Sequence, residues 1–259
     1  ATAYYDSVPL VCFTGQVSRP LIGNDAFQEV DIVGITRSIT KYGVMVKNRD
    51  DLGRIIKEAF YIARSGRPGP VVIDLPKDVM AELGDPEYPS EVNIRGYKPN
   101  TMAHVGQLKR AMKMLNKAKR PLFLVGGGVK ISHASEEFTE LVNITNVPVV
   151  TTVMGRGAIP TNHPLYIGNL GMHGAYACNM AVSECDLLFS IGTRFNDRIT
   201  GKLHSFAPKA QIIHIDIDTA AISKNVKVDV PIVADARDAL TRMLEYVEPC
   251  ETKQWIEQI

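Results

Sequence analysis

Short apolar runs of strand length alternate with segments of helical periodicity along nearly the whole chain. In the first part, apolar stretches at residues 8–14 and 71–75 flank residues 51–63, where apolar side chains recur at helical spacing. Strands that are apolar on both faces are typical of parallel sheets whose two sides are covered by helices. The alternation therefore predicts an α/β fold.

A stretch with little periodicity divides this series in two. It contains Pro86, Pro89, Gly96 and Pro99, and such a composition is typical of an inter-domain linker. We expect residues 86–101 to form this linker. Residues 1–85 supply too few strands for a free-standing sheet, which indicates the C-terminal half of a separate α/β unit.

The alternation restarts after the linker, and residues 102–259 are predicted to form a doubly wound, Rossmann-like domain around a parallel sheet. The expected helices cover residues 104–117, 135–145, 176–185 and 236–247. The expected strands cover residues 121–125, 147–153, 186–191, 211–215 and 228–233.

The balance of charge argues against nucleic acid and anionic membrane as partners. The chain has 29 Lys and Arg and 28 Asp and Glu, a formal net charge of +1, so the clustered basic excess that such partners require is missing. No apolar run approaches the roughly 20 residues of a membrane-spanning helix. We therefore expect small molecules or proteins as partners, and neither nucleic acid nor a membrane.

Histidine, cysteine and serine patterns give no sign of metal or simple hydrolytic chemistry. The six histidines and four cysteines show no metal-ligand spacing, and the Gly-x-Ser-x-Gly pattern of many hydrolases is absent. We predict no metal site in this chain. Cysteines scattered in this way suit buried thiols in a reducing compartment.

Glycine, hydroxyl, arginine and acidic residues follow the predicted strands of the second domain. They lie at residues 126–128, 151–155, 192–198, 216–218 and 234–235. The carboxyl ends of parallel strands meet at one edge of a sheet, and ligands bind there. Glycines let the backbone approach a phosphate, while arginine and acidic side chains can hold phosphate and ribose. These strand ends predict a cradle for a dinucleotide.

Other interpretations of the same residues stay open. One alternative is that the glycines form helix caps and tight turns and bind no ligand. Residues 126–128 lack the G-x-G-x-x-G spacing, and Asn146 stands about 20 residues on, where an NAD site has an acid, so NAD is disfavoured. His173 lies between two glycines, and it is either a proton-transfer group or a residue that shapes a pocket.

Motifs in both parts of the chain point to one family. In the first part they are Thr-Gly-Gln-Val at 14–17, Ile-Gly-Asn-Asp-Ala-Phe-Gln-Glu at 22–29, Ser-Gly-Arg-Pro-Gly-Pro-Val at 65–71 and Asp-Leu-Pro-Lys-Asp at 74–78. In the second they are Gly-Asn-Leu-Gly-Met-His-Gly at 168–174, Gly-Thr-Arg-Phe-Asn-Asp-Arg at 192–198, Thr-Gly-Lys at 200–202 and His-Ile-Asp-Ile-Asp at 214–218. Over essentially its whole length, the sequence resembles the catalytic large subunits of acetohydroxyacid (acetolactate) synthases, which depend on thiamine diphosphate.

The resemblance implies an enzyme of three domains that bind the pyrimidine of thiamine, FAD and the diphosphate. This chain matches the back half of the first domain and the second domain, so FAD is expected to bind to it. The family's cofactor-activating glutamate lies upstream of the matched part. Its Gly-Asp-Gly motif for thiamine diphosphate and Mg²⁺ lies in the third domain and is absent here. The chain is therefore expected to be a fragment that is inactive alone.

The resemblance also implies a reaction and its setting. Two pyruvates, or pyruvate and 2-oxobutyrate, condense with loss of CO2 to 2-acetolactate or 2-aceto-2-hydroxybutyrate in branched-chain amino acid biosynthesis. FAD is required, although it does no net redox work. Members are herbicide targets and homo-oligomers (dimers or tetramers), and a small regulatory subunit is a further expected partner. The expected location is the cytoplasm, or the plastid in a plant.

Individual residues receive roles from the resemblance. Those that match residues bordering the thiamine and substrate pocket are Phe27, Gln28, Lys77, Met172, His173 and Arg198. Those that match FAD contacts are Arg67, Gly127, Gly128, Thr152, Val153, Leu170, Gly171, Met172, His173, Gly192, Thr193, Arg194, Phe195, Asn196, Asp216, Ile217 and Asp235.

Arg198 is the residue for which we expect the most specific role. A planar guanidinium after a buried strand can form a paired contact with the carboxylate of the second 2-oxo acid. The alternative is a salt bridge to Asp197 or Asp218. The sequence departs from the family at Asn196, where most members have Asp, and at Ser18, where many have Pro in the region of herbicide binding. Inhibitor sensitivity is therefore open.

Two rival functions belong to different classes. One is another thiamine diphosphate carboligase, decarboxylase or oxidase, such as glyoxylate carboligase or pyruvate oxidase. The other is a non-catalytic module that only binds a nucleotide. Arg198 and the segment 25–29 favour the synthase.

Overall fold

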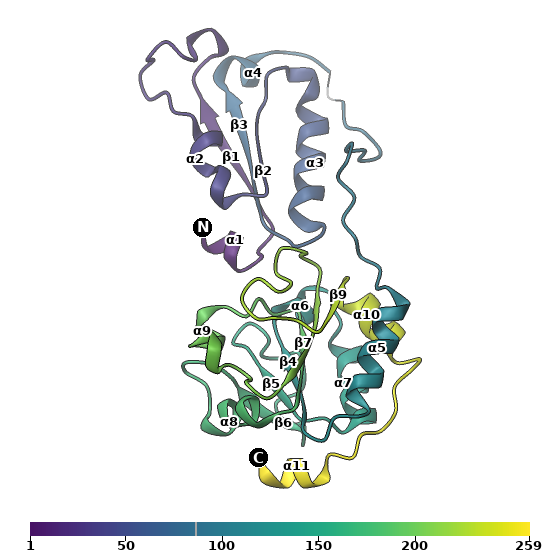
Figure 1. The fold of residues 1–259 in the computed structure, drawn as a ribbon. Helices are drawn as coiled ribbons and strands as arrows, with labels where there is room; N and C mark the ends of the chain where they lie inside the picture. The colour runs from purple at the N-terminus through teal and green to yellow at the C-terminus, as the bar shows by residue number, and fades with distance from the viewer. Residues whose placement is uncertain (86) are drawn as a thin grey trace. The chain divides into compact units, whose positions relative to one another are not determined.

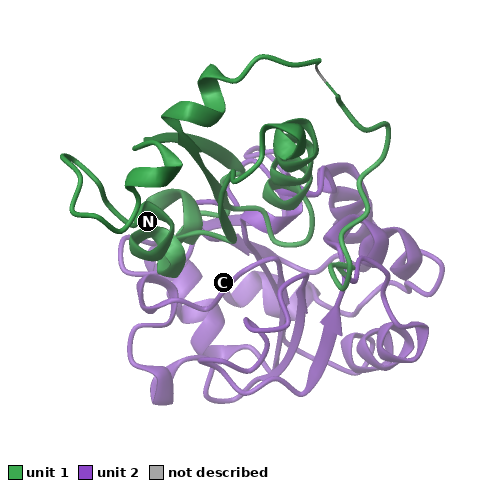
Figure 2. Cartoon of the chain, turned by 90° about the horizontal axis from the view of Figure 1, so that it is seen from above, with its two compact units in different colours: residues 1–99 green, residues 100–259 purple. Residues whose placement is uncertain are grey.

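The computed structural model describes residues 1–85 and 87–259. The chain divides into two compact units, residues 1–99 (unit 1) and residues 100–259 (unit 2), which Figure 2 colours separately. The division falls within the stretch 86–101 that we expected to be a linker. Both units are α/β with parallel strands, which confirms that part of the predicted fold (Figure 1).

Unit 1 contains a three-stranded parallel sheet in the order β1-β3-β2, with β1 at Leu10–Gln16, β2 at Tyr42–Met45 and β3 at Pro70–Pro76. Helix α3 (Leu52–Arg64) packs on the sheet. It buries Ile55, Ala59, Ile62 and Ala63, whose spacing places them on one helical face. The shorter helices are α1 (Thr2–Tyr5), α2 (Ile32–Thr36) and α4 (Lys77–Ala81).

Unit 2 contains a six-stranded parallel sheet in the order β6-β5-β4-β7-β8-β9. The strands are β4 (Pro121–Val125), β5 (Val149–Thr151), β6 (Tyr166–Asn169), β7 (Leu187–Ile191), β8 (Gln211–Asp216) and β9 (Val230–Val233). The helices are α5 (Val105–Leu115), α6 (Gly127–Ile131), α7 (Ser135–Thr145), α8 (Tyr176–Glu184), α9 (Asp197–Thr200), α10 (Ala236–Met243) and α11 (Lys253–Gln258). The strand order reverses between β4 and β7, as in doubly wound nucleotide-binding folds.

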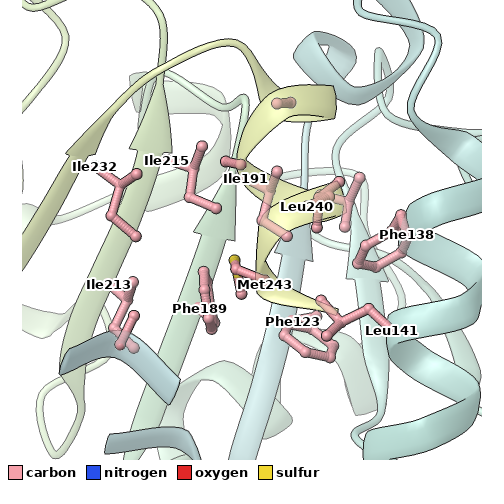
Figure 3. Packing of buried hydrophobic residues seen from close by; sticks show 14 of the residues in the cluster. Phe123, Phe138, Leu141, Phe189, Ile191, Ile213, Ile215, Ile232, Leu240 and Met243 are labelled. Carbon is pink, nitrogen blue, oxygen red and sulfur yellow. The ribbon is translucent and has the colours of Figure 1, made fainter. Parts of the chain in front are cut away.

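Side chains from the two faces of this sheet enter separate cores. Phe189 of β7 packs with Phe123, Phe138 of α7 and Leu240 of α10 on one face (Figure 3), and the preceding residue of β7, Leu188, enters the other core. The second core includes residues of α8 and Trp255 of α11. Burial on both faces explains why these strands are continuous apolar runs in the sequence.

Trp255 fixes α11 beside the amino end of β4. Its side chain is 4% exposed, and its indole N–H donates a hydrogen bond to the carbonyl of Pro121 at 3.0 Å. The guanidinium of Arg120 lies 5.7 Å from the centre of the ring, which is cation–π range.

Several expected bounds were wrong, and β2, β6 and α11 were not expected. The predicted strand at 147–153 is limited to β5, because the Thr152 hydroxyl accepts a hydrogen bond from the Gly155 N–H at 3.0 Å and begins a turn. The predicted helix at 236–247 ends at Met243. Among the described residues, no helix combines the length and the apolar character that crossing a membrane requires.

Candidate functional site

The loops after β4 and β7 meet at the point where the strand order of unit 2 reverses. The N–H of Gly126 donates to the carbonyl of Ile191 at 2.9 Å, and the N–H of Gly128 donates to the carbonyl of Gly192 at 3.1 Å. The N–H of Gly192 donates in turn to the carbonyl of Ile215 at 2.8 Å. The carboxyl edge of the sheet is therefore held together by backbone hydrogen bonds.

Glycine is required where these two loops touch. A Cβ added to Gly126 would lie 2.1 Å from the carbonyl oxygen of Gly192, and one added to Gly128 would lie 2.6 Å from the Gly192 Cα. Gly192 itself has φ +61°, which favours glycine. The glycines thus serve the tight packing that was one of their two interpretations.

A buried histidine on the neighbouring strand β8 holds the loop after β7 by a hydrogen bond. His214 of β8 is fully buried, and its Nε2 lies 2.8 Å from the carbonyl of Thr193. A carbonyl only accepts, so Nε2 carries the proton. The ring also contacts Phe195, which has φ +50°. The Nδ1 of His214 and the Oγ of Ser190, its register partner on β7, are buried without a hydrogen-bond partner among the described residues.

Two of the predicted acidic contacts already have backbone partners. Asp216 ends β8, is 9% exposed, and accepts a hydrogen bond from the Asp218 N–H at 2.9 Å. Asp235 is the N-cap of α10, and its side chain accepts from Arg237 and Asp238. Ile217 lies between the two acids of the β8 end. A ligand at this edge would meet a partly accessible carboxylate at Asp216 and a capping carboxylate at Asp235.

The loop after β6 brings three of the predicted pocket residues together. The N–H of Met172 donates to the carbonyl of Arg198 at 2.9 Å, and a guanidinium nitrogen of Arg198 lies 3.7 Å from the Met172 sulfur. His173 is the next residue, and all three side chains are exposed. Gly171 permits this turn with φ +113°, and the Asn179 side chain bonds both its N–H and its carbonyl.

Arg198 pairs only weakly with the neighbouring acid. Its Nε lies 3.7 Å from an Asp197 carboxylate oxygen, and the side chains are 66% and 78% exposed. Exposed pairs of this kind contribute about 0–1 kcal/mol. The weak pair leaves the guanidinium accessible to an incoming carboxylate.

The other predicted cofactor contacts lie at the ends of β5, β6 and β7. Val153 is 69% exposed, whereas Leu170, Thr193 and Phe195 are buried. Gly127 begins α6, Arg194 is half-buried, and Asn196 is exposed at the start of α9.

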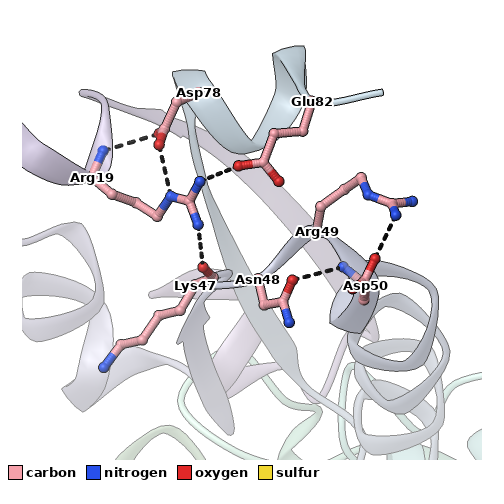
Figure 4. A network of polar contacts seen from close by, with 7 residues as sticks. All are labelled: Arg19, Lys47, Asn48, Arg49, Asp50, Asp78 and Glu82. Atoms are coloured by element: carbon pink, nitrogen blue, oxygen red, sulfur yellow. Dashed lines mark hydrogen bonds and ion pairs between the residues drawn. The ribbon is translucent and has the colours of Figure 1, made fainter. Parts of the chain in front are cut away.

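In unit 1, Phe27 and Gln28 share a loop that follows β1, and Lys77 begins α4. An arginine that the sequence analysis overlooked ties these segments together. The Arg19 N–H and Nε donate to the two carboxylate oxygens of Asp78 at 3.0 and 2.7 Å. Figure 4 shows that the same guanidinium also reaches the Lys47 carbonyl and Glu82.

Arg67, a predicted FAD contact, packs against the N-terminal segment of its own unit. Its Nε donates to the Ser7 hydroxyl at 3.0 Å, and Nη2 donates to the Tyr4 carbonyl at 3.2 Å. Nearby, Lys41 donates to the carbonyls of Ile62 and Ser65 at the end of α3. Burial and the charge of Arg67 lower the pKa of Lys41 to about 8.

Two of the four cysteine thiols are poorly suited to nucleophilic chemistry. All four cysteines are free, and Cys12 and Cys250 are half-buried rather than buried. Burial raises the pKa of the Cys185 thiol to about 12 and that of Cys250 to about 11, which makes them poor nucleophiles. Within residues 1–85 and 87–259, no group of three or more His, Cys, Asp or Glu side chains is arranged to hold a metal ion.

A hollow of about 720 Å³ lies away from these strand ends, between α7 and residues 157–161. Its lining includes Glu136, Thr139, Glu140 and Asn143 and none of the predicted site residues. We therefore place the candidate site at the carboxyl edge of the sheet.

Comparison with known families decides between the classes of protein that share this architecture. The sequence model described as "Thiamine pyrophosphate enzyme, central domain" matches residues 108–243, which cover more than half of the chain. The chain belongs to the thiamine pyrophosphate enzymes. The match covers α5 through α10 and therefore includes every strand of the unit 2 sheet.

Relatives of this thiamine pyrophosphate enzyme extend the similarity to unit 1. Over all of the chain, it is 50% identical to the "Probable acetolactate synthase large subunit" of Methanocaldococcus jannaschii and 46% identical to the "Acetolactate synthase isozyme 3 large subunit" of Escherichia coli. Over 94% of the chain, it is 50% identical to the "Acetolactate synthase" of Mycobacterium bovis. The chain spans 45%, 46% and 40% of these relatives, respectively.

Proposed function

We propose that this chain is part of an acetolactate synthase large subunit, which joins two 2-oxo acids with loss of CO2. The observation that carries the proposal is the 46–50% identity to acetolactate synthase large subunits over the entire chain, unit 1 included. A module that only binds a nucleotide would need similarity in unit 2 alone. The substrates are pyruvate with a second pyruvate or with 2-oxobutyrate.

The chain's own residues bind and orient the 2-oxo acids. Thiamine diphosphate, held with Mg²⁺, supplies the carbon centre that takes up the first 2-oxo acid and lets CO2 leave. We assign contacts with it and with substrate to Phe27, Gln28 and Lys77 in unit 1. In unit 2 we assign such contacts to Met172, His173 and Arg198. The guanidinium of Arg198, accessible beside Met172, holds the carboxylate of the second 2-oxo acid.

FAD is the proposed cofactor of unit 2, and the residues at the carboxyl edge suit it. Gly127 and Gly128, half-buried at the start of α6, carry no side chain that would keep a phosphate from the backbone. The exposed side chains of Val153 and Met172 offer apolar surface to a ring system. The Asp216 carboxylate offers an acceptor to a hydroxyl group. The position agrees with the rule that ligands bind where the strand order reverses.

The proposed assembly follows from the names of the relatives. A large subunit implies a small regulatory subunit, and we propose a homo-oligomer of catalytic subunits. The four free thiols suit the reducing conditions of the cytoplasm.

The activity is tested in a chimera of the E. coli isozyme 3 large subunit whose matched 261-residue segment is replaced by this chain. We expect acetolactate from pyruvate with thiamine diphosphate, Mg²⁺ and FAD, at a rate within an order of magnitude of the parent subunit. A folded, cofactor-loaded chimera that decarboxylates pyruvate but never joins two 2-oxo acids would refute the synthase assignment.

Arg198→Lys in the chimera tests the carboxylate contact. Lysine keeps the charge but loses the paired geometry, so carboligation should fall about tenfold relative to decarboxylation, a difference of about 1.4 kcal/mol. Arg242→Lys is the control, because Arg242 pairs with Asp238 on α10. Equal effects of the two substitutions would make Arg198 structural.

FAD binding is tested by titrating FAD into the 259-residue chain and its Asp216→Asn variant. Asparagine keeps one acceptor oxygen but loses the charge that strengthens the hydrogen bond, so the affinity should fall up to about tenfold. Asp186→Asn is a matched control, because Asp186 accepts the N–H groups of Lys119 and Arg120 at the opposite end of β7. Equal affinities of all three proteins would remove Asp216 from the site.

A further inference from the structure

The loop of residues 17–30, between β1 and α2, is anchored at its base by side chains of the sheet. The Gln16 amide donates to the Val30 carbonyl at 2.8 Å and to the Asp74 carboxylate at 3.1 Å. Asp74, which is 1% exposed, also accepts from the Thr14 hydroxyl at 2.7 Å. At the other end of the loop, the Asp78 carboxylate accepts hydrogen bonds from the backbone N–H and the side chain of Arg19. Both ends of the 17–30 loop are therefore fixed to unit 1.

The tip of the loop is closed by the Glu29 carboxylate together with a backbone hydrogen bond, in which the Glu29 N–H donates to the Ala26 carbonyl at 3.0 Å. Each oxygen of Glu29 accepts a different backbone N–H, one from Gly23 and one from Ala26, the latter at 3.2 Å. Residues 23–29 consequently form a compact turn around the Glu29 side chain. In this turn Asn24, Asp25 and Phe27 are exposed, whereas Glu29 is half-buried.

The backbone of the tip is held in a costly conformation. Gly23, Asp25 and Gln28 have φ values of +82°, +51° and +62°, and Asp25 and Gln28 carry the Cβ that disfavours this region. Residues of this kind persist only where the surroundings over-determine them, and they cluster at functional sites. Phe27 lies between Asp25 and Gln28 in this turn and is 87% exposed.

We propose that Glu29 is a positioning residue that preorganises Phe27 and Gln28 for the 2-oxo acid. The inference rests on the proposed function, and it adds a residue that touches neither substrate nor cofactor. Without the carboxylate, the backbone hydrogen bond from the Glu29 N–H to the Ala26 carbonyl remains, but among the described contacts nothing links the N–H groups of Gly23 and Ala26 to residue 29. The tip would then populate other conformations in the absence of substrate.

The expected effect on kinetics follows from the fraction of free protein whose 17–30 loop has the binding-competent conformation. When only a fraction f of the free protein has the competent loop, the apparent dissociation constant rises by 1/f, so a fall of f to about one tenth weakens binding about tenfold. Saturating substrate restores the competent loop. Glu29→Ala should therefore raise KM for pyruvate about tenfold while kcat stays within about twofold of the wild type.

The experiment pairs this measurement with amide hydrogen exchange. In the 259-residue chain, Glu29→Ala should speed exchange at Gly23 and Ala26, because the open fraction 1 − f rises as the competent fraction f falls. Glu29→Gln keeps one acceptor oxygen, so both effects should be smaller, about threefold. Asp31→Asn is the control, because Asp31 also accepts a backbone N–H, that of Gly34 in α2 at 2.8 Å, but lies outside the turn.

Each outcome decides the proposal. Faster exchange together with a rise in KM at nearly unchanged kcat supports it. Faster exchange with unchanged KM shows that the turn has no role in substrate binding, and unchanged exchange shows that Glu29 does not hold the turn; either result overturns it. A loss of kcat at unchanged KM also overturns it. If the wild-type chimera forms no acetolactate, the proposed function fails, and exchange alone decides whether Glu29 is the anchor.

Discussion

The two units of this chain hold their strand-end loops by different means. In unit 1 the loop after β1 is held by carboxylates, namely Asp74, Asp78 and Glu29. In unit 2 the loops after β4 and β7 are held by backbone hydrogen bonds and by contact between glycines. The first arrangement is sensitive to amide substitution of a carboxylate, whereas the second is sensitive to a single added methyl group.

The largest difference between the units should appear in their apolar packing. Phe123 of β4 is fully buried and packs against the rings of Phe138 and Phe189, so Phe123→Ala should cost about 3–5 kcal/mol of unfolding free energy. Phe13 of β1 is 50% exposed, and Phe13→Ala should cost about 1 kcal/mol. Urea titration followed by circular dichroism measures both. Similar losses of unfolding free energy for the two variants would mean that both sheets are equally well buried, which would contradict the difference between the units.

The next largest effect should come from a methyl group added to glycine. The Cβ of Gly128→Ala would collide with the backbone of Gly192 at 2.6 Å, and because neither backbone can rotate away, the cost should reach about 3 kcal/mol. A Cβ added to Gly15 of β1 would meet nothing within 4 Å, so Gly15→Ala should change stability by less than about 0.5 kcal/mol. Thermal unfolding of the two variants would compare them directly.

A smaller effect is expected at the buried carboxylate of unit 1. Asp74→Asn keeps an acceptor for Thr14 but turns an amide N–H₂ toward Gln16 or Thr14, which should cost about 1–2 kcal/mol. In a double-mutant cycle with Thr14→Val, a coupling free energy above about 0.5 kcal/mol would show the direct contact. Strict additivity of the two substitutions would contradict the hydrogen bond at 2.7 Å.

The smallest effect concerns pH. The hydrogen bonds and charge of Arg19 hold the pKa of Asp78 below its ordinary value of 3.8. The pKa of Asp78 is higher in the unfolded chain than in the folded one. The stabilisation is therefore complete above the unfolded pKa and is lost as pH falls through the folded pKa. Arg19→Gln should therefore lower stability more at about pH 6 than at a pH below the folded pKa of Asp78, where only contacts with uncharged groups such as the Lys47 carbonyl are lost. In an Asp78→Asn background this difference should vanish, and its persistence would point to Glu82 instead.

The contrast between the units also explains what the sequence could predict. Strands β4, β7 and β8 are buried on both faces, and their apolar runs are visible in the sequence. Strands β2 and β6 are short and half-buried, so their pattern is too weak to separate from loops. The glycine-rich strand ends were found because glycine clusters after apolar runs stand out.

The carboxylate anchors of unit 1 could not be found in the same way. Thr14 and Asp74 are separated by 60 residues, and they meet only because β1 pairs with β3 in one particular register. A sequence pattern does not specify which strands pair. The roles of Arg19 and Glu29 likewise depend on turns whose backbone angles are set by tertiary contacts. The motif at 22–29 included Glu29 but did not reveal which groups its carboxylate holds, and nothing in the sequence singled out Arg19.

The burial of Trp255 gives the protein an optical property that distinguishes its parts. The chain has one tryptophan, and its indole lies in the core of unit 2 with its N–H bonded to Pro121. An indole shielded from water emits at shorter wavelength than one in solvent, and unfolding shifts the emission to the red. Fluorescence excited selectively at tryptophan therefore reports on unit 2 alone, and the tyrosines of unit 1 stay silent in that signal.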